Sequence, residues 1–544
     1  MHVDLNNIAS YDSKGAKTFI ADAGDYYFAL GTDSHDALNN VLAKQGKTVA
    51  DGMTANGDAS KVYQWNWSSF DDATYSVSSN GVEITNRLSD GDSSMDLNSF
   101  EGYEDTVTYL SRSDWNGTFP ESYEGLAATG RLAKLLGNDF IELSTNDDTS
   151  EYVWGADNGL TLSDFKGADW EDYRWSELVD QVTIDEFLAF AGNAFHNIAP
   201  IPSVNYVGNQ ADDGPGGSDS HTLNEGQFEG TPWSDAAEYN GFGTRVAPSQ
   251  QNLAYSWNKE LAYENGEIIL GETSLIFNLP IIIGPGMNLH RHGYNGRGGE
   301  YYSEDPILSG YIGSASIQGA QSKGVLVNIK HAAFNDQEIN RSGIAVFMNE
   351  QKARELELRN LQQAFEGKGK PASFYDNEEY NDTYTQGAYG VMSSYNRIGA
   401  TASSANRGVM VDIMRNEWGF KGYNVTDFTG VTLKAAPKES ILAGTTAFCG
   451  FGSASGSVAE YWSGDVLSKD ADMCAAIKNN IKYILFSLAN SNALNGVNST
   501  TKRVELMTGW RATYITMLTV FSATTITTAT LFLVSYFRQR KVGK

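Results

Sequence analysis

The sequence predicts an α/β protein: a TIM-type (β/α)8 barrel with a short N-terminal β-sandwich remnant and linker, plus one C-terminal transmembrane helix. Three observations support this prediction. Short apolar runs alternate with longer amphipathic stretches from about residue 170 onward. Charged and polar side chains directly follow several of these apolar runs. Residues 512–537 contain no charged side chain.

The composition excludes several classes of function. The 544 residues carry a formal charge of −28, which excludes a nucleic-acid binder that neutralises phosphates. With 41% hydrophobic and 12% aromatic residues, the chain is rich enough in apolar side chains to build a core. We interpret Cys449 and Cys474 as two buried thiols, although a single bridge stays open if the chain is exported. The histidines lack metal-ligand spacing, so we expect no metal and no cofactor.

The N-terminal residues 1–45 have the pattern of a β-sandwich tail. Thr18–Ile20 and Tyr26–Leu30 predict two short strands joined by a hairpin-type turn. Two strands do not form a stable sheet alone, so the remaining strands of the sandwich are expected upstream. Residues 35–44 have the apolar spacing of a helix. Residues 46–169 are interpreted as a linker and the region that precedes the barrel.

Residues 170–496 alternate strand and helix patterns, as in a parallel α/β protein. The continuous apolar runs predict strands that are buried on both faces, and the number of repeats favours a closed barrel over an open sheet. The expected strands are Val204–Val207, Ile281–Ile283, Val325–Ile329, Val391–Met392 and Tyr423–Val425. The expected helices are Leu178–Ala191, Gln251–Leu270, Pro306–Ser322, Met348–Glu366 and Val409–Trp418.

Residues 512–537 predict a single membrane span. A helix of this length reaches about 39 Å, enough to cross the hydrocarbon core of a bilayer. Its threonines can return their hydroxyl groups to preceding carbonyls. Residues 497–511 form the juxtamembrane segment, and the basic tail 538–544 predicts a cytoplasmic C-terminus. We therefore expect a single-pass protein of the cell membrane with its catalytic region outside the cell.

The first residues lack an export signal. Residues 1–30 have no basic start, no apolar stretch and no cleavage site. Because an extracellular region must be exported, we expect either a signal upstream in a longer precursor or a split protein with a partner chain.

Functional groups of a parallel barrel gather where its strands end. The residues after the expected strands carry carboxylate, guanidinium, ammonium, imidazole or phenol groups. Carboxylates accept hydrogen bonds from sugar hydroxyls and cations donate to them, so the set favours a sugar site. The sequence has no phosphate-binding glycine loop in the usual spacing and no Gly-x-Ser-x-Gly nucleophile motif.

Six motifs within residues 170–490 carry a resemblance. They are WSELVDQVTIDEF (175–187), DGP (213–215), GRGGEYYSEDP (296–306), KHAAFNDQEINR (330–341), VMSSYNRIGA (391–400) and MRNEWGFKGYNVTD (414–427). In this order they resemble the barrel domain of glycoside hydrolase family 3, the β-glucosidase and β-xylosidase-type enzymes. The resemblance implies a retaining double displacement, in which a carboxylate attacks the anomeric carbon and an acid protonates the leaving oxygen.

The resemblance also implies roles for individual residues. Asp427 takes the place of the nucleophile, and a carboxylate near Lys330 and Arg297 is expected to stay ionised at neutral pH. A helix N-cap is the alternative role for Asp427. The implied substrate-binding residues are Asp213, Arg297, Lys330, His331, Arg341, Met392, Tyr395 and Phe428.

Some of these positions leave a choice open. An interior ion-pair network that organises loops is a credible alternative for Arg341 and Glu300. Met392 is expected in the wall of the site or in the core, and Tyr395 resembles a phenol that touches the nucleophile. Phe428 stands where the family usually has Trp, which predicts a smaller platform for the sugar.

The general acid is the main departure from the family. In most members it is a Glu on a separate α/β sandwich domain, and the residues between Asp427 and the membrane span leave no room for that domain. Some members place it before the barrel, followed by a fibronectin type III-like β-sandwich, which residues 11–40 resemble. We therefore expect the acid upstream of Met1 or on a partner chain. Asp336 and Glu338 stay open as acids, with nothing to mark either one.

The resemblance implies a β-glucosidase-like O-glycosyl hydrolase acting on the non-reducing ends of β-linked glycosides, incomplete or weakly active as an isolated chain. Its expected partners are a small carbohydrate substrate and the membrane. A non-catalytic carbohydrate-binding or receptor protein is the alternative: the missing acid favours it, and the retained Asp427 argues against it. An inert gene fragment is a third possibility. The sequence does not indicate which sugar or linkage is cleaved.

Overall fold

The computed structural model describes residues 5–543, apart from 110–126, 138–140, 145–146, 193, 195–196, 215–246, 278, 292, 294, 368–370, 377–378, 385–386, 429–435, 450–461 and 502–506. The chain divides into two compact units, Met1–Ser499 and Thr500–Lys544. The first unit holds the sheet and the candidate site, and the second holds one long helix.

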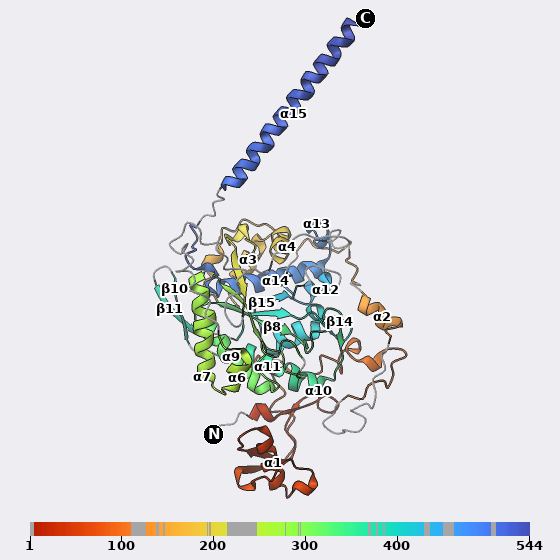
Figure 1. The fold of residues 1–544 in the computed structure, drawn as a ribbon, viewed down its shortest axis with the longest axis vertical. Coiled ribbons are helices and arrows are strands. Elements are labelled where there is room, and N and C mark those ends of the chain that lie inside the picture. Colours follow the sequence, from red (N-terminus) through yellow and green to blue (C-terminus); the bar gives the residue numbers. More distant parts are fainter. Residues whose placement is uncertain are drawn as a thin grey trace. The chain divides into compact units, whose positions relative to one another are not determined.

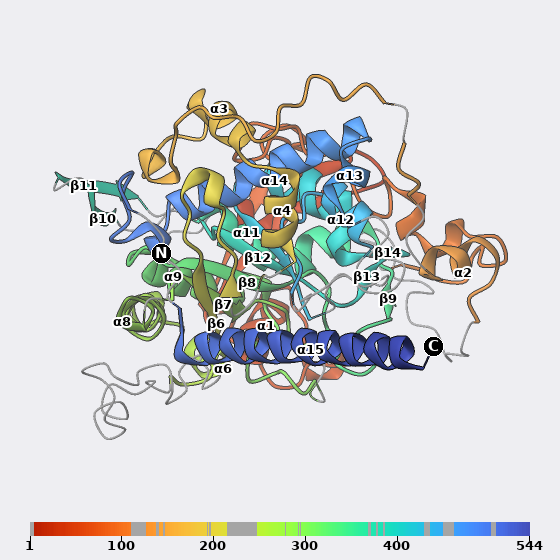
Figure 2. The ribbon, with the colours of Figure 1, turned by 90° about the horizontal axis from the view of Figure 1, so that it is seen from above.

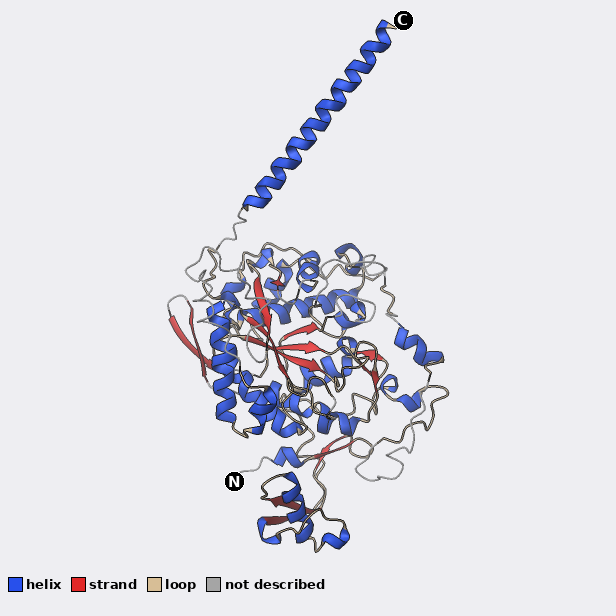
Figure 3. Cartoon of the chain, viewed as in Figure 1, coloured by secondary structure: helices blue, strands red, loops and turns tan. Residues whose placement is uncertain are grey.

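A six-stranded sheet forms the centre of the first unit, with helices on both of its sides (Figures 1 and 3). Its strand order is β15-β12-β8-β7-β6-β5, and every neighbouring pair is parallel except β5 with β6. The strands are β5 (Asn197–Ile198), β6 (Asn209–Asp213), β7 (Ile281–Gly286), β8 (Leu326–Ala332), β12 (Gly390–Ser393) and β15 (Tyr423–Thr426).

The parallel strands are buried on both faces, as their continuous apolar runs predict. Ile281 and Ile283 belong to one hydrophobic cluster, whereas Ile282, between them, belongs to another. This division follows from the two-residue period of a strand. Helices α3, α4 and α14 supply the first cluster and α9 and α11 the second, and the two groups lie on opposite sides of the sheet in Figure 1. Figure 2 shows the same elements from above.

The helices of the first unit cover this sheet. The longer ones are α1 (Ser34–Lys44), α2 (Gly130–Gly137), α3 (Arg174–Gln181), α4 (Ile184–Ala191), α6 (Gln250–Tyr255), α7 (Lys259–Asn265), α9 (Pro306–Gln321), α11 (Arg359–Glu366), α12 (Pro437–Leu442) and α14 (Ala471–Ala489). Shorter pieces are α8 (Thr273–Phe277), α10 (Glu350–Lys352) and α13 (Gly464–Leu467), and π-helical winding occurs in η9 (Gly266–Glu272), η10 (Ala353–Glu357) and η12 (Gly408–Glu417).

Two predicted helices are divided. Leu178–Ala191 breaks because Val182 is extended and Thr183 starts α4 with a capping box that includes Glu186. The Gln251–Leu270 stretch breaks at Trp257, which has a left-handed φ of 54°. Apolar spacing continued through both breaks, so periodicity alone did not reveal them.

The prediction of a strand at Val204–Val207 is wrong. Pro202–Val204 forms a 3-10 turn, and Asn205 adopts a left-handed φ of 57°. The strand is β6, five residues later in the chain, and it ends at Asp213. Asp213 therefore belongs to the strand itself.

The sheet curls. Ala447 pairs with Val425 of β15, and the next residue, Phe448, donates its backbone N–H to the carbonyl of Ala191 at 2.7 Å. Ala191 ends α4, shortly before β5. In the described part of the chain this sheet is a curled, mostly parallel half-barrel, so the TIM-like curvature is present and a closed ring of eight strands stays a prediction.

The N-terminal strands pair differently from the prediction. β2 (Thr18–Ile20) pairs with β1 (Ser10–Asp12), and β3 (Gly24–Ala29) pairs with β4 (Val62–Trp67), both antiparallel. The predicted hairpin between Thr18–Ile20 and Tyr26–Leu30 is therefore wrong, because each strand found its partner elsewhere in the chain. Helix α1 confirms the helix expected at residues 35–44 and packs on β3.

Smaller elements complete the first unit. The remaining strands are β9 (Ala345–Val346), β10 (Pro371–Asp376), β11 (Glu379–Tyr384), β13 (Arg397–Ile398) and β14 (Thr401–Ala402). Short 3-10 turns are η1 (Leu5–Ile8), η2 (Val49–Asp51), η3 (Ala59–Lys61), η4 (Ser93–Met95), η5 (Leu97–Ser99), η6 (Leu162–Phe165), η7 (Pro202–Val204), η11 (Ser403–Ala405) and η15 (Asn492–Leu494). Cys449 and Cys474 are both buried, and neither forms a disulfide bond.

The second unit contains α15 (Gly509–Val542), a helix long and apolar enough to cross a membrane. Its threonines return their hydroxyl groups to the carbonyl four residues earlier, as in the 2.8 Å bond from Thr519 Oγ1 to Ile515 O. Thr516, Thr524 and Thr528 do the same. These bonds satisfy the hydroxyl groups without water, which suits a threonine-rich segment in lipid.

Candidate active site

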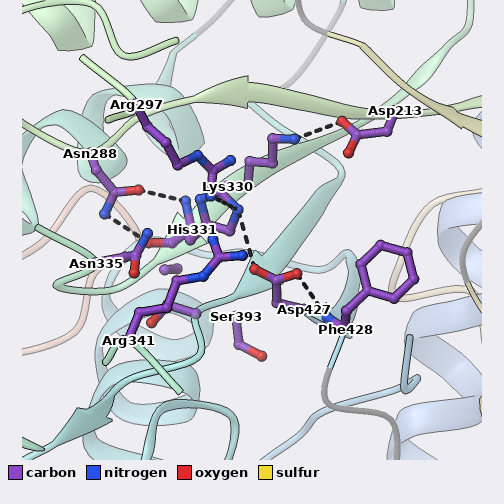
Figure 4. A network of polar contacts seen from close by, with 12 residues as sticks. Asp213, Asn288, Arg297, Lys330, His331, Asn335, Arg341, Ser393, Asp427 and Phe428 are labelled. Atoms are coloured by element: carbon purple, nitrogen blue, oxygen red, sulfur yellow. Dashed lines mark hydrogen bonds and ion pairs between the residues drawn. The ribbon is translucent and has the colours of Figure 1, made fainter. Parts of the chain in front are cut away.

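The carboxyl ends of three strands bring the predicted polar residues together (Figure 4). Asp213 ends β6, Lys330 and His331 lie near the end of β8, and Asp427 directly follows β15. Strands of a parallel sheet end at one edge, so side chains far apart in the sequence meet there.

Asp427 is held at the centre of this group. It is 7% exposed, and its Oδ1 accepts the backbone N–H of Phe428 at 2.7 Å. Its backbone N–H donates to Ser393 O at 3.0 Å, which fixes the residue against β12. The Tyr395 hydroxyl lies within hydrogen-bonding reach of its carboxylate. Asp427 therefore presents one oxygen to a backbone donor and the other toward the site.

Burial raises the pKa of Asp427, whereas the Phe428 N–H and the cations Arg341, Lys330 and Arg297 lower it. The net direction is upward. The three cations act on Asp427 as expected, but their effect is smaller than the cost of burying the charge. Asp427 is therefore more basic than an exposed aspartate.

His331 is a neutral contact of Asp427. Its Nε2 lies 3.4 Å from Asp427 Oδ2 and 3.2 Å from Arg297 Nη1. Burial, followed by repulsion from Arg297, Lys330 and Arg341, holds the pKa of His331 well below its usual value. The ring is therefore uncharged near neutral pH, and its contact with Asp427 is not an ion pair.

Asn288 fixes the backbone of His331 from both sides. Its Oδ1 accepts the His331 N–H at 2.8 Å, and its Nδ2 donates to His331 O at 3.1 Å. Tyr301 Oη lies 3.4 Å from His331 Nδ1. These contacts fix the imidazole in the orientation that faces Asp427.

Lys330 bridges two acids. Its Nζ lies 2.6 Å from Asp213 Oδ1 and 3.2 Å from Glu300 Oε1. Burial lowers the pKa of Lys330, but Asp213 and Glu300 outweigh it and the net direction is upward. Lys330 is therefore a buried ammonium that stays charged.

Glu300 joins Lys330 to Arg297. Arg297 binds it with two parallel bonds, Nε to Oε2 at 2.6 Å and Nη2 to Oε1 at 2.7 Å. Burial opposes ionisation of Glu300, but Arg297 and Lys330 outweigh it and hold its pKa below the usual value. Glu300 thus forms the ion pairs named as its alternative role, and the choice between that role and a sugar contact stays a prediction.

Arg341 forms an ion pair within the network, and its guanidinium group also lies over an aromatic ring of the site. Its Nη1 lies 2.7 Å from Glu338 Oε2, and its guanidinium carbon lies 4.4 Å from the ring centre of Tyr395. Glu338 also lies 3.9 Å from Arg297 and accepts from Asn335 Nδ2 at 3.1 Å. A surface hollow of about 740 Å³ is lined by residues of the loop 337–344, Glu338 and Arg341 among them, so this edge of the network reaches the surface.

Met392 and Phe428 lie at opposite extremes of exposure. Met392 is 2% exposed and belongs to the hydrophobic cluster with Ile281. Its contribution is therefore to packing, and a sugar contact for it stays a prediction. Phe428 is 56% exposed and directly follows Asp427 in the chain.

Three residues of the network were not predicted: Asn288, Tyr301 and Asn335. Asn335 donates to Tyr301 Oη at 3.1 Å and so supports the contact of Tyr301 with His331. Asn288 and Tyr301 both follow β7, the strand whose end supplies Arg297. Their position after a buried strand was the available signal, but neutral side chains do not stand out among charged ones.

Asp336 and Glu338, the two acids left open from the sequence, have different surroundings. Glu338 contacts two guanidinium groups and one amide. Asp336 interacts with Glu357, Lys352 and Arg291. Burial and the charge of Glu357 raise the pKa of Asp336 to about 8, so it holds a proton near neutral pH, but its side-chain contact is with Glu357.

Comparison with known proteins finds a family match within the first unit. Residues 237–447 match the family described as "Glycosyl hydrolase family 3 N terminal domain". The probable β-glucosidase K of Emericella nidulans is 30% identical over 250 residues, which are 46% of this chain and 26% of that protein. The exo-α-(1→6)-L-arabinopyranosidase of Bifidobacterium breve is 32% identical over 252 residues, 46% of this chain and 30% of that protein. The matched regions thus span less than a third of either relative.

A solved structure extends the likeness of fold. The β-glucosidase of Paenibacillus barengoltzii superposes with a TM-score of 0.58 at 18% identity, covering 92% of this chain and 48% of that one. This likeness concerns the fold alone. The family match concerns residues 237–447, and it names the family that the sequence motifs resemble.

Proposed function

We propose that the chain is the barrel portion of a retaining, β-glucosidase-like glycoside hydrolase that acts on the non-reducing ends of β-linked glycosides. The observation that carries this proposal is the placement of Asp427. It is a buried carboxylate at a strand end, fixed by a backbone N–H and surrounded by three cations and a neutral histidine. A site that only binds sugars does not need such a carboxylate.

In this mechanism Asp427 attacks the anomeric carbon. A C–O ester bond forms to Asp427 while the glycosidic C–O bond breaks, and the leaving oxygen takes a proton from an acid. Water then gives a proton to the conjugate base of that acid and attacks the anomeric carbon, which breaks the ester bond, releases the sugar and restores the carboxylate. Two inversions at one carbon retain its configuration.

The remaining residues bind and orient the sugar. Asp213 has a side chain that is 30% exposed, so it has room to accept from a hydroxyl while Lys330 holds its other side. His331, Lys330 and Arg297 offer donors, and Arg341 lies over Tyr395 beside the hollow. Phe428 offers a ring face smaller than a tryptophan's for the sugar's apolar side.

The general acid is proposed to lie on an α/β sandwich domain outside this sequence. Glu338 is held by two arginines and Asp336 interacts with Glu357, so neither is assigned as the acid. General acid catalysis contributes about 10²–10⁴-fold, or about 3–5 kcal/mol of barrier. The isolated chain should therefore cleave aryl glycosides with good leaving groups while leaving natural disaccharides almost untouched.

The domain assignments follow as proposals. Residues 1–45 are the tail of a fibronectin type III-like sandwich, 46–169 a linker and 170–496 a barrel that closes. The strand β3 of this tail pairs with β4, which lies within residues 46–169, and the two strands carry aromatic side chains on one face, with Tyr26 beside Trp65 and Phe28 beside Tyr63. Tyr63 is 66% exposed, as expected of a sheet face that lacks its covering sheet.

The membrane assignment is also a proposal. Residues 497–511 are the juxtamembrane segment and 512–537 cross the cell membrane, within α15. The basic tail 538–544 lies in the cytoplasm, which places the barrel outside the cell.

Kinetics with two substrate types test the proposed function. The full chain, in a detergent that is not a glycoside, is given a nitrophenyl β-glycoside and the matching natural disaccharide. We expect turnover of the aryl glycoside, release of the β-anomer seen by NMR before mutarotation, and rates at least about 10²-fold lower for the disaccharide. Equal rates on both substrates would contradict an absent acid, and reversible binding without any turnover would favour the binding-protein alternative.

A further inference from the structure

The loop between β8 and β9 has contacts with the site on one side and with neighbouring loops and helices on the other. Asn335 and Glu338 reach toward the site, where Glu338 contacts Arg297 and Arg341. The backbone carbonyl of Asp336, between them, accepts from Asn295 Nδ2 at 3.0 Å. Asn295 in turn accepts the N–H of Arg297 at 3.0 Å. Asp336 therefore lies at the junction of the two loops that carry Arg297 and Arg341.

The side chain of Asp336 interacts with a second acid. Glu357, at the end of η10, lies within hydrogen-bonding reach of it. Arg291 Nε, at 3.5 Å, and Lys352 Nζ, at 3.2 Å, both approach Glu357 Oε1. Asp336 Oδ1 is buried and accepts no hydrogen bond from the described residues. Two cations thus form ion pairs with Glu357, yet Glu357 Oε1 and Asp336 Oδ1 are both buried oxygens that accept no hydrogen bond from the described residues.

One proton shared between the two carboxyl groups satisfies this arrangement. Burial, followed by the charge of Glu357, raises the pKa of Asp336 to about 8, while Lys352 and Arg291 lower it. Two ionised carboxylates in contact would repel each other at low dielectric. The pair titrates as a unit, and the shared proton, the last of the pair, is lost above neutral pH.

We propose that Asp336, through a proton shared with Glu357, is a positioning residue that fixes the loop carrying Glu338 and Arg341 against the sugar site. Its relevance to catalysis rests on the proposed function, but the loop's dependence on this proton does not. When the proton leaves, the carboxyl groups repel, the loop detaches from η10, and Arg341 and Arg297 lose the anchor supplied by Glu338.

The consequence for activity is a loss at alkaline pH. At pH values below the titration of the pair the loop is in place. At higher pH one ionisation makes kcat/KM fall about tenfold per pH unit. Asp336→Asn keeps the shape and a donor but has no proton to lose. Glu357→Gln removes the partner charge and leaves Arg291 and Lys352 to compensate an ionised Asp336. In both variants kcat/KM should therefore no longer fall at alkaline pH.

The first measurement is the pH profile of kcat/KM on an aryl β-glycoside, from pH 5 to 10. The unchanged chain should lose activity above about pH 8 and the two variants should stay flat by comparison, while the matched surface variant Asp412→Asn should follow the unchanged chain. A fall in Asp336→Asn equal to that of the unchanged chain would overturn the proposal.

The second measurement does not need activity. Backbone hydrogen exchange of peptides covering residues 335–346 is compared between the unchanged chain and Asp336→Asn at the same pH, which cancels the intrinsic base dependence of exchange. Exchange should be equal at pH 6 and at least about fivefold faster in the unchanged chain at pH 9. Equal exchange at both pH values would overturn the proposal. Absent turnover with this difference in exchange present would count against the proposed function alone.

Discussion

Two buried charge networks in the first unit have similar chemistry and opposite surroundings. In the structural network, Arg354 binds Glu350 at 2.9 Å and Glu417 at 2.7 Å, and it donates to the carbonyl of Thr85. All three charged side chains are at most 3% exposed. In the site network, the side chains of Asp213 and Arg341 are each 30% exposed.

The difference lies in what completes each network. Glu350 also accepts the backbone N–H groups of Arg87 and Leu88, at 2.8 and 2.7 Å, so its charge serves to fix the N-terminal region to the helices of the barrel. The site network ends at a hollow beside Arg341 and Glu338. A closed network stabilises the fold, and an open one keeps donors and acceptors for a ligand.

The largest expected effect concerns the open network. Asp427→Asn should lower kcat on an aryl β-glycoside by at least about 10³-fold, because it removes the nucleophile without changing the size of the side chain. The thermal midpoint should change little. A rate within tenfold of the unchanged chain would contradict the role of Asp427.

The next effect separates the two networks by stability. Arg354→Met leaves Glu350 and Glu417 buried without their cation, which should cost about 3–5 kcal/mol of unfolding free energy. Lys330→Met should cost less stability and far more activity, since Asp213 is partly exposed and Glu300 keeps Arg297. Urea unfolding followed by tryptophan fluorescence, together with kcat per folded molecule, distinguishes the two outcomes. If Arg354→Met and Lys330→Met lose activity and stability in the same proportion, the two networks do not differ in role.

A smaller effect concerns acid pH. Burial raises the pKa of Asp427, and only its ionised form is nucleophilic, so kcat/KM should fall as the pH decreases through a value above that of an exposed aspartate. Lys330→Met should move this fall to still higher pH, because Lys330 lowers the pKa of Asp427. The pH dependence of kcat/KM measures both shifts. A fall near pH 4 in both proteins would show that burial does not dominate.

The smallest effect concerns the rim of the site. Phe428 is 56% exposed, so Phe428→Trp should leave the unfolding free energy within about 0.5 kcal/mol. A larger ring face should lower KM for an aryl glycoside a few-fold, with kcat unchanged. An unchanged KM would place Phe428 outside the sugar contact.

Much of the barrel followed from local sequence patterns. Buried parallel strands such as β7 and β8 are continuous apolar runs, and the polar residues after them converge because parallel strands end at one edge. The breaks in the predicted helices could not be predicted from the sequence. The backbone conformations of Val182 and Trp257 end a helix, but the apolar spacing continues past them. The pairing of β3 with β4 joins distant segments, which no local pattern specifies.

The candidate site divides in the same way. Charged residues were found because they follow strands, whereas Asn288 and Asn335 act through hydrogen bonds that only the fold reveals. The upward shift of the Asp427 pKa could not be predicted from the sequence either, because it depends on how deeply the carboxylate is buried. Sequence reasoning thus identified the chemistry but not its energetic balance.

Trapping the covalent intermediate tests the central claim most directly. The full chain is incubated with a fluorinated mechanism-based β-glycoside that carries a good leaving group, then analysed by intact mass and by peptide mapping. We predict an increase in mass of one fluorosugar, located at Asp427 in the peptide that contains residues 423–428 and absent from Asp427→Asn. A label on another carboxylate, or turnover without any labelled intermediate, would contradict the account.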